Sequence, residues 1–155
     1  MIDQIKDIAL YIVLAIMINL LSFFLGGKYF IEYLIDNLIT VQLTLLAINT
    51  ATSGLIVSKM QDIKKDNPEL DLKPISQSLS SSLKEQIILI VIAIVLLVII
   101  DSHVTEKVIY TNYVDFILEV MVIAVFINSV QILWDTGKSI FLMVDITDMN
   151  DDWLN

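Results

Sequence analysis

The chain consists of long apolar runs separated by short polar segments. The four runs cover residues 8–25, 38–57, 87–100 and 114–134. A helix that crosses a membrane needs about 20 mostly apolar residues. The first, second and fourth runs provide that length directly, and the second also has an amphipathic start, so its span is counted from residue 31. The third has fourteen strictly apolar residues and reaches spanning length when it is extended to Leu83 and Val104, with Lys84 directed towards water.

These runs predict an all-α integral membrane protein with a single domain, 1–155, of four transmembrane helices arranged as two helical hairpins. The expected spans are residues 8–25, 31–57, 83–104 and 113–135. A polar, helical cytoplasmic loop, 58–86, should connect the second and third spans, and a cytoplasmic tail, 137–155, should follow the fourth. The first run is longer than the apolar part of a usual secretory signal and contains no small-x-small cleavage site, so we expect it to be retained.

Composition supports a membrane protein and argues against nucleic-acid binding. The sequence is 57% hydrophobic with a mean hydropathy of +0.81, whereas soluble domains are about 45–50% apolar. All nine basic residues are Lys, and the net charge is −9. Bidentate recognition of phosphate favours Arg, and an acidic surface repels nucleic acid. Because the chain has no cysteine, disulfides and thiolate metal sites are excluded.

The lysines predict the orientation of the helices. With four spans, Lys28 and Lys107 lie on one side of the membrane, and the other seven lysines lie on the side that holds both termini and the loop 58–86. Short cytoplasmic segments are enriched in Lys and Arg. We therefore expect a multi-pass protein of the inner cell membrane with both termini in the cytoplasm.

The end of the fourth run invites comparison with a nucleotide-binding P-loop. Gly137, Lys138 and Ser139 match the last three positions of that motif. The first glycine of the motif would fall at Ile132, inside an apolar run of helical period that no strand precedes. The sequence therefore predicts no nucleotide site here, and Gly137 is expected near the point where the helix leaves the membrane.

The same segment carries a polar stripe. Asn128, Gln131, Asp135 and Lys138 are spaced by three, four and three residues, which places them on one helix face. Polar groups are costly in lipid, so this face is expected to point into protein or water. Two interpretations stay open: hydrogen bonds between helices, or the wall of a water-filled path.

Other spans contain further candidates of the same kind. Gln42 and Asn49 lie seven residues apart on the second span, and the third run contains no polar residue and is expected to face lipid. The candidate interior polar residues are Asn19, Gln42, Asn49, Asn128, Gln131 and Asp135. Small residues in the segment NTATSG are expected to let another helix approach closely. These candidate packing residues are Ala47, Thr50, Ala51 and Gly54.

Acidic residues gather at the expected outer ends of the second and fourth spans. They form two pairs of i, i+4 spacing: Glu32 with Asp36, and Asp115 with Glu119. Carboxylates near a helix N-terminus interact favourably with its dipole, which explains them without a further role. If several copies surround an axis, the same residues would form an acidic outer mouth that concentrates cations.

A weak internal repeat is a further hypothesis. A shift of 79 residues aligns Asp36 with Asp115 and Asn49 with Asn128, as two hairpins of the same direction would. His103, the single histidine, is expected to be a polar flank of the third span. No nucleophile–base pair, metal-ligand cluster or cofactor motif is found in the sequence, so we expect no enzyme activity and no metal or cofactor.

Two functions are compatible with these features. The favoured one is an oligomeric ion channel or pore-forming effector with an acidic outer mouth and an amide-lined interior. The alternative is a non-conducting membrane anchor or sensor that docks a cytosolic protein through 58–86 and the tail. In size and layout the chain resembles small four-helix membrane subunits of bacterial phage-defence systems, and that resemblance fits the alternative. The expected partners are membrane lipid, further copies of the chain and a cytosolic protein, not nucleic acid.

Overall fold

The computed structural model describes residues 2–66, 68–69, 71–102 and 111–151. They form four helices: α1 (Ile2–Leu25), α2 (Tyr29–Asp66), α3 (Lys73–Asp101) and α4 (Thr111–Asp151). The expected all-α fold is confirmed, and all four helices are long and apolar enough to span a membrane. His103, Val104, Lys107 and the tail beyond Asp151 lie outside the described residues.

Local sequence sets the ends of the helices. After α1, Gly26 adopts a φ of +66°, in the left-handed region that favours glycine. The Gly27 N–H donates to the Ser22 carbonyl at 2.9 Å, which completes a Schellman-type end. Pro74 occupies the first turn of α3, where the absence of its N–H breaks no helical hydrogen bond. The connection of α2 to α3 is therefore short, because most of the predicted loop 58–86 is helix.

The helices α2, α3 and α4 pack along a heptad pattern. Their fully or nearly fully buried positions recur every seven residues, as they do in coiled coils. In α2 these are Gln42, Asn49 and Ile56; in α3, Leu79, Gln86 and Ala93, preceded by Leu72 at the N-cap of the helix; in α4, Val122, Ser129 and Thr136. This period brings side chains of the three helices together in layers, with polar groups in some layers and apolar groups in others.

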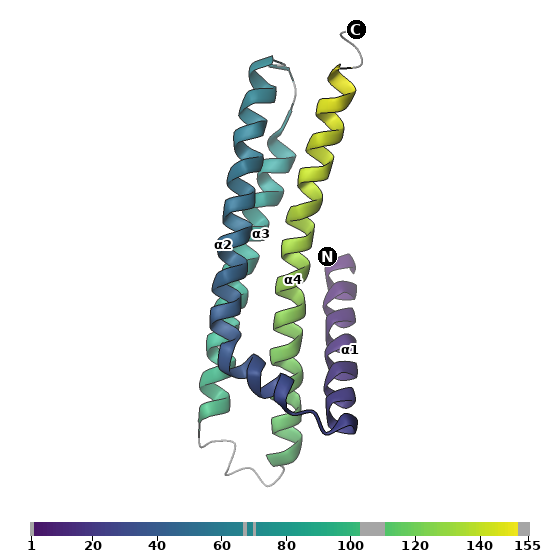
Figure 1. The fold of residues 1–155 in the computed structure, drawn as a ribbon, viewed down its shortest axis with the longest axis vertical. Coiled ribbons are helices and arrows are strands. Elements are labelled where there is room, and N and C mark those ends of the chain that lie inside the picture. Colours follow the sequence, from purple (N-terminus) through teal and green to yellow (C-terminus); the bar gives the residue numbers. More distant parts are fainter. Residues whose placement is uncertain (1, 67, 70, 103–110, 152–155) are drawn as a thin grey trace.

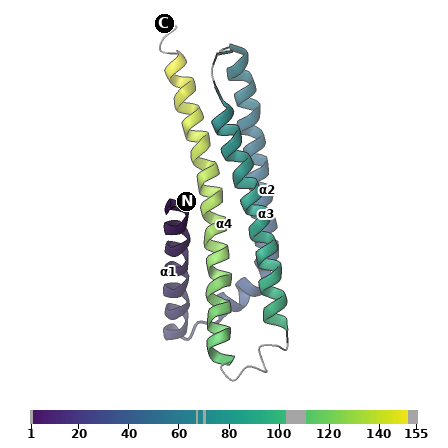
Figure 2. The same cartoon turned by 180° about the vertical axis from the view of Figure 1, so that it is seen from behind.

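Helix α1 packs against α4, on the side of α4 away from α3 (Figures 1 and 2). Ala15 and Asn19 mark its buried face, and the Asn19 amide donates to the Phe116 carbonyl of α4 at 3.4 Å. It makes few contacts with α2 and α3. The first turns of α2 run obliquely from the foot of α1 before the helix turns along the bundle (Figure 1).

The other three helices extend well beyond α1. At 1.5 Å per residue, the 24 residues of α1 span about 36 Å and the 38 residues of α2 about 57 Å. The start of α1 reaches only part of the way along the bundle (Figures 1 and 2). Beyond it, α2 and α3 enclose a second small core, made of Ile56, Met60, Leu72 and Leu79. We call this end of the bundle, where α2 and α3 are connected, the hairpin end.

Large apolar side chains cover the outside of the bundle. In the last turns of α1 the exposed fraction reaches 75% at Phe23 and 82% at Phe24. Soluble monomers rarely expose a continuous apolar patch of more than a few hundred Å². The outer surface therefore suits lipid, as expected of a multi-pass membrane protein.

The structure corrects the expectation that the third helix faces lipid. One stripe of α3 is buried against its neighbours, including Leu89, Ala93 and Leu96, while Val91, Val95 and Val98 face outwards. Gln86, which directly precedes the apolar run, is fully buried. A uniformly apolar run gives no sign of which face packs, because every face has the same hydropathy.

The 79-residue shift carries most of the buried positions of the first hairpin onto exposed positions of the second. It places Leu38 and Gln42, both 0% exposed, on Ile117 and Met121, which are 57% and 43% exposed. The hairpins also pack differently, since α3 lies along α4 whereas α1 makes few contacts with α2. The inward faces of the two hairpins are therefore unrelated.

Candidate functional site: polar groups within and beside the bundle

A hydrogen-bonded polar layer lies inside the bundle of α2, α3 and α4. The Gln86 side-chain N–H donates to the Gln42 Oε1 at 3.0 Å, and the Ser129 hydroxyl is 2.8 Å from the same oxygen. The Ser129 hydroxyl is also 2.9 Å from the Val125 carbonyl of its own helix. All three side chains of the layer are 0% exposed. One amide oxygen thus joins three helices.

Further polar residues continue from this layer towards the hairpin end. Asn49 follows Gln42 by two helical turns and is 0% exposed, and Ser53 lies one turn further on. On α4, Thr136 follows Ser129 by seven residues and donates to the Ile132 carbonyl at 3.1 Å. We call the whole set the polar column. Its members are Gln42, Asn49, Ser53, Gln86, Ser129 and Thr136.

Five buried atoms of the polar column have no hydrogen-bond partner among the residues that the structure describes. They are Gln42 Nε2, Gln86 Oε1, Ser53 Oγ, and both Nδ2 and Oδ1 of Asn49. Each unpaired buried polar atom costs about 1–3 kcal/mol, and most such groups in proteins are paired with protein or water. The column therefore holds unused capacity to bind water or an ion. Asn49 has the most unpaired atoms of any member, because neither its amide oxygen nor its amide nitrogen has a partner.

The stripe that the sequence predicts on α4 does not join the polar column. Asn128 and Gln131 are half-buried, and Asp135 is exposed. The Asp135 Oδ1 accepts from the Gln131 amide at 3.2 Å and from the Lys138 ammonium at 3.0 Å. Successive helix residues point about 100° apart, so the face with Ser129 turns towards α2 and α3, and the stripe turns to the side.

That side of α4 forms a groove between α1 and α3, which we call the side groove. Its volume is about 420 Å³. Asn128, Gln131 and Asp135 line it from α4, Asp7 and Tyr11 from α1, and Glu85 from α3. The apolar part of the wall consists of Ile8, Ile88, Leu89, Ile92 and Ile132. Asn49 does not line this groove, so the structure separates it from the stripe.

The other predicted residues occupy the outside of the bundle. Glu32, Asp36 and Asp115 are exposed and Glu119 is half-buried, and all four belong to the first turns of α2 and α4, opposite the hairpin end. The candidate packing residues of α2 are exposed or nearly so, on a face turned away from Asn49 and Ser53. They are Ala47, Thr50, Ala51 and Gly54. We call this surface the small-residue face.

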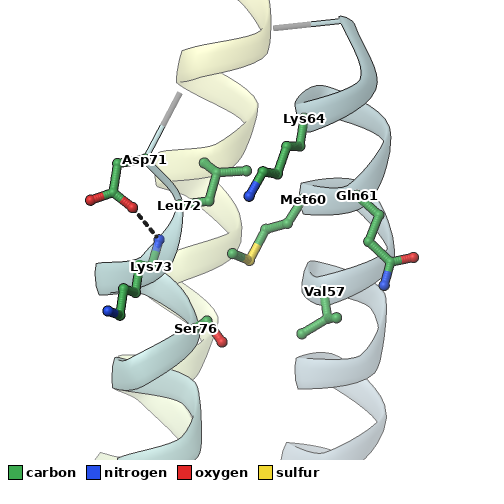
Figure 3. A pocket seen from close by; sticks show the side chains of 8 residues that line it. All are labelled: Val57, Met60, Gln61, Lys64, Asp71, Leu72, Lys73 and Ser76. Atoms are coloured by element: carbon green, nitrogen blue, oxygen red, sulfur yellow. Dashed lines mark hydrogen bonds between the residues drawn. The ribbon is translucent and has the colours of Figure 1, made fainter. Parts of the chain in front are cut away.

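A second groove lies at the hairpin end, between the last turns of α2 and the first turn of α3. Met60 and Lys64 point from α2 towards Leu72, and the Asp71 carboxylate accepts from the Lys73 N–H at 3.0 Å (Figure 3). The groove has a volume of about 380 Å³. Val57, Met60 and Leu72 form its apolar part, and Lys64 and Lys73 also line it. We call it the hairpin groove.

Sequence reasoning missed four of the six members of the polar column and three of the six polar or charged residues that line the side groove. Ser129 and Thr136 could have been found from the seven-residue spacing already visible between Gln42 and Asn49, whereas Ser53 and Gln86 do not continue that spacing. Asp7, Tyr11 and Glu85 have no such signal, because they meet Asn128 only through packing of three helices. Within the residues that the structure describes, no group of three or more His, Asp or Glu is placed to hold a metal ion.

Comparison with protein families, with characterised proteins and with solved structures finds no match. The arrangement of helices and polar groups defines the chain as an all-α protein with four helices able to span a membrane and a polar column inside a three-helix bundle.

Proposed function

We propose that the protein spans the inner membrane four times, with the hairpin end and both termini in the cytoplasm. The apolar outer surface supports insertion, and the distribution of lysines supports this orientation. Lys59, Lys64, Lys65 and Lys73 lie at the hairpin end, whereas Lys28 lies at the opposite end. The start of α1 and the end of α4 both point to the hairpin end (Figure 1).

Labelling of single cysteines tests this orientation. Cysteines introduced by Lys28→Cys and Lys65→Cys should react with a membrane-impermeant maleimide from opposite faces of sealed vesicles, because the two sites lie at opposite ends of the bundle. The chain has no natural cysteine, so the unmodified protein is the matched control. Reaction of both sites from the same face would contradict four spans.

We infer that the membrane protein conducts small cations through the polar column. The observation that supports this is the set of five unpaired polar atoms inside the bundle of α2, α3 and α4. Groups of this kind can replace the hydration shell of an ion, as amide and carbonyl oxygens do in ion pathways. The acidic residues at the opposite end, Asp36 and Glu119 among them, would raise the local concentration of cations.

Conduction would require the bundle to open, because the side chains of the polar column are buried. Gln42, Asn49 and Gln86 are all 0% exposed. A small separation of α2 from α3 and α4 would break the bonds to Gln42 Oε1 and admit water to Asn49. Flux of a monovalent cation from liposomes that contain the purified protein is the direct test. Absence of flux at every pH and voltage would exclude this function.

The conducting unit is proposed to be a homo-oligomer that assembles through the small-residue face of α2. Small residues let helix backbones approach closely in a membrane, and Ala47, Ala51 and Gly54 lie exposed on one surface of a single chain. Assembly of this kind would place the acidic ends of several copies around one axis.

Mass measurement in mild detergent and in nanodiscs is expected to show several copies. Ala51→Phe should increase the fraction of monomer about tenfold or more, because a bulky ring separates the backbones. The control is Val91→Phe, an outward position of α3 that is 55% exposed and lies on a different helix from the small-residue face. A wild-type protein that is monomeric in both environments would refute the oligomer.

The second candidate function is a membrane anchor that docks a cytosolic protein. The observation that favours it is the length by which α2, α3 and α4 continue past α1, together with the hairpin groove at their end (Figure 3). In this case the polar column would act only as a contact between helices. Substitution of Val57, a residue of the groove that is 39% exposed, by Asp would then abolish the cellular effect of the protein, and liposomes would show no flux.

A further inference from the structure

The side groove exists because α1 and α3 both pack on α4 but make few contacts with each other. Figure 2 shows α1 and α3 on either side of α4. The wall of the groove contains five large apolar side chains from all three helices. Its volume, about 420 Å³, lies in the range of about 300–1,000 Å³ that is usual for small-molecule sites.

The charged groups of the side groove are all acidic. Asp7 of α1, Glu85 of α3 and Asp135 of α4 line it, and no lysine does among the described residues. Tyr11 lies in the same wall as the three carboxylates. Asp135 is paired with Lys138, but Glu85 has only a hydrogen bond from Ser81, at 3.2 Å, among the described contacts. The groove therefore favours a positive charge.

The shape of the groove indicates what kind of cation fits. A metal ion needs several ligands that converge on one point, and the described residues offer no such group of carboxylates. The acidic side chains are instead distributed along an apolar wall. A zwitterionic phospholipid would bring a phosphate beside the same carboxylates, with no lysine in the lining to neutralise it. An organic cation with an alkyl chain meets both conditions.

We propose that the side groove binds a cationic amphiphile. Its ammonium head lies among Asp7, Glu85 and Asp135, with the amide of Gln131 beside it. Its alkyl chain lies along Ile88 and Ile92, towards the part of the bundle that faces lipid. This site does not depend on ion conduction, and it goes beyond the proposed function by giving the stripe on α4 a ligand.

Electron paramagnetic resonance of spin-labelled amphiphiles tests the proposal. The full-length protein is placed in phosphatidylcholine liposomes with a nitroxide-labelled hexadecyl-dimethylammonium probe, or with nitroxide-labelled stearate at a pH where it is anionic. We expect the cationic probe to show an immobilised fraction that corresponds to about tenfold stronger association than that of the anionic probe. Equal association of the two probes would overturn the proposal.

Two kinds of variant separate the groove from general surface charge. Asp7→Asn with Glu85→Gln should weaken association of the cationic probe about tenfold, the usual scale for loss of two partly screened charges. The matched control, Asp36→Asn with Glu119→Gln, also removes one aspartate and one glutamate charge, but at the opposite end of the bundle. It should leave association of the cationic probe unchanged. An equal loss in the control would show attraction to the surface and refute the site.

A third variant tests the alkyl chain and keeps every charge. Ile92→Trp should fill the groove and weaken association of the cationic probe by about tenfold. Ile92 is 39% exposed, so the bundle can accept the larger ring. Ile92→Trp could bind the cationic probe as the wild type does, while loss of the carboxylates weakens binding. The site would then take only a cationic group, such as a lysine of a partner protein, and the proposal of an amphiphile would be wrong.

Discussion

Replacing Ala93 with leucine is expected to destabilise the bundle by about 1–3 kcal/mol, the usual cost of overpacking a filled core. Ala93 is 0% exposed and belongs to the main core, one heptad after Gln86 on α3. The leucine side chain would need space that α2 and α4 already fill. Close approach of helices in a membrane depends on such small residues, so the added carbons should push α3 outwards.

The measurement for Ala93→Leu is the midpoint of unfolding in a titration of mild detergent with sodium dodecyl sulfate, which should fall clearly. Ile94→Leu is the matched control, because Ile94 is the next residue and is 46% exposed. An isomeric change on an outward face should leave the midpoint unchanged. If Ala93→Leu unfolds at the wild-type midpoint, α3 does not pack on its neighbours along the face described here.

Substitutions in the polar layer are expected to give non-additive results. Gln42→Met removes the oxygen that accepts from Gln86 and Ser129 and leaves the Gln86 amide buried without a partner. The expected loss of stability is about 1–2 kcal/mol. Adding Gln86→Met should restore most of that loss, because replacing both partners by apolar groups of similar shape is nearly neutral.

The same double variant tests conduction. The stability of Gln42→Met with Gln86→Met is expected to be close to that of the wild type. The double variant should nevertheless lower cation flux from liposomes at least tenfold, because it removes the two amides that an ion would meet in the layer. A tenfold decrease corresponds to an energy barrier only about 1.4 kcal/mol higher. The control carries Gln61→Met and Gln77→Met, two exposed positions, and should conduct normally. Undiminished flux in the double variant would show that the polar column is structural and that ions take another route.

Much of the fold could be predicted from the sequence because it depends on local properties. The length and hydropathy of four runs predict four helices, and the double glycine at Gly26 and Gly27 marks the first turn between them. The inward spacing of Gln42 and Asn49 was visible as well. The free energy of transfer between water and lipid is a property of each side chain, so hydropathy along the chain is enough to predict the helices and the turn.

The candidate sites depend on which helix faces meet, and here the sequence misled in part. Asn128, Gln131 and Asp135 form the most polar stripe of the fourth run, yet α4 turns Ser129 and Thr136 into the bundle and directs the stripe to the side groove. A serine or threonine can satisfy its hydroxyl with a carbonyl of its own helix, as both of these do. Their polarity therefore gave little sign of burial.

The sequence by itself determined the number of helices, their apolar surface and the polar residues that must find a place away from lipid. Only the tertiary structure decided that Gln86 of α3 pairs with Gln42, and that Asp7 and Glu85 join Asp135. The reason is physical. Transfer into lipid is a property of each side chain, whereas pairing depends on the shapes of faces on three helices that are distant in the sequence, and α3 is apolar on every face from 87 to 100.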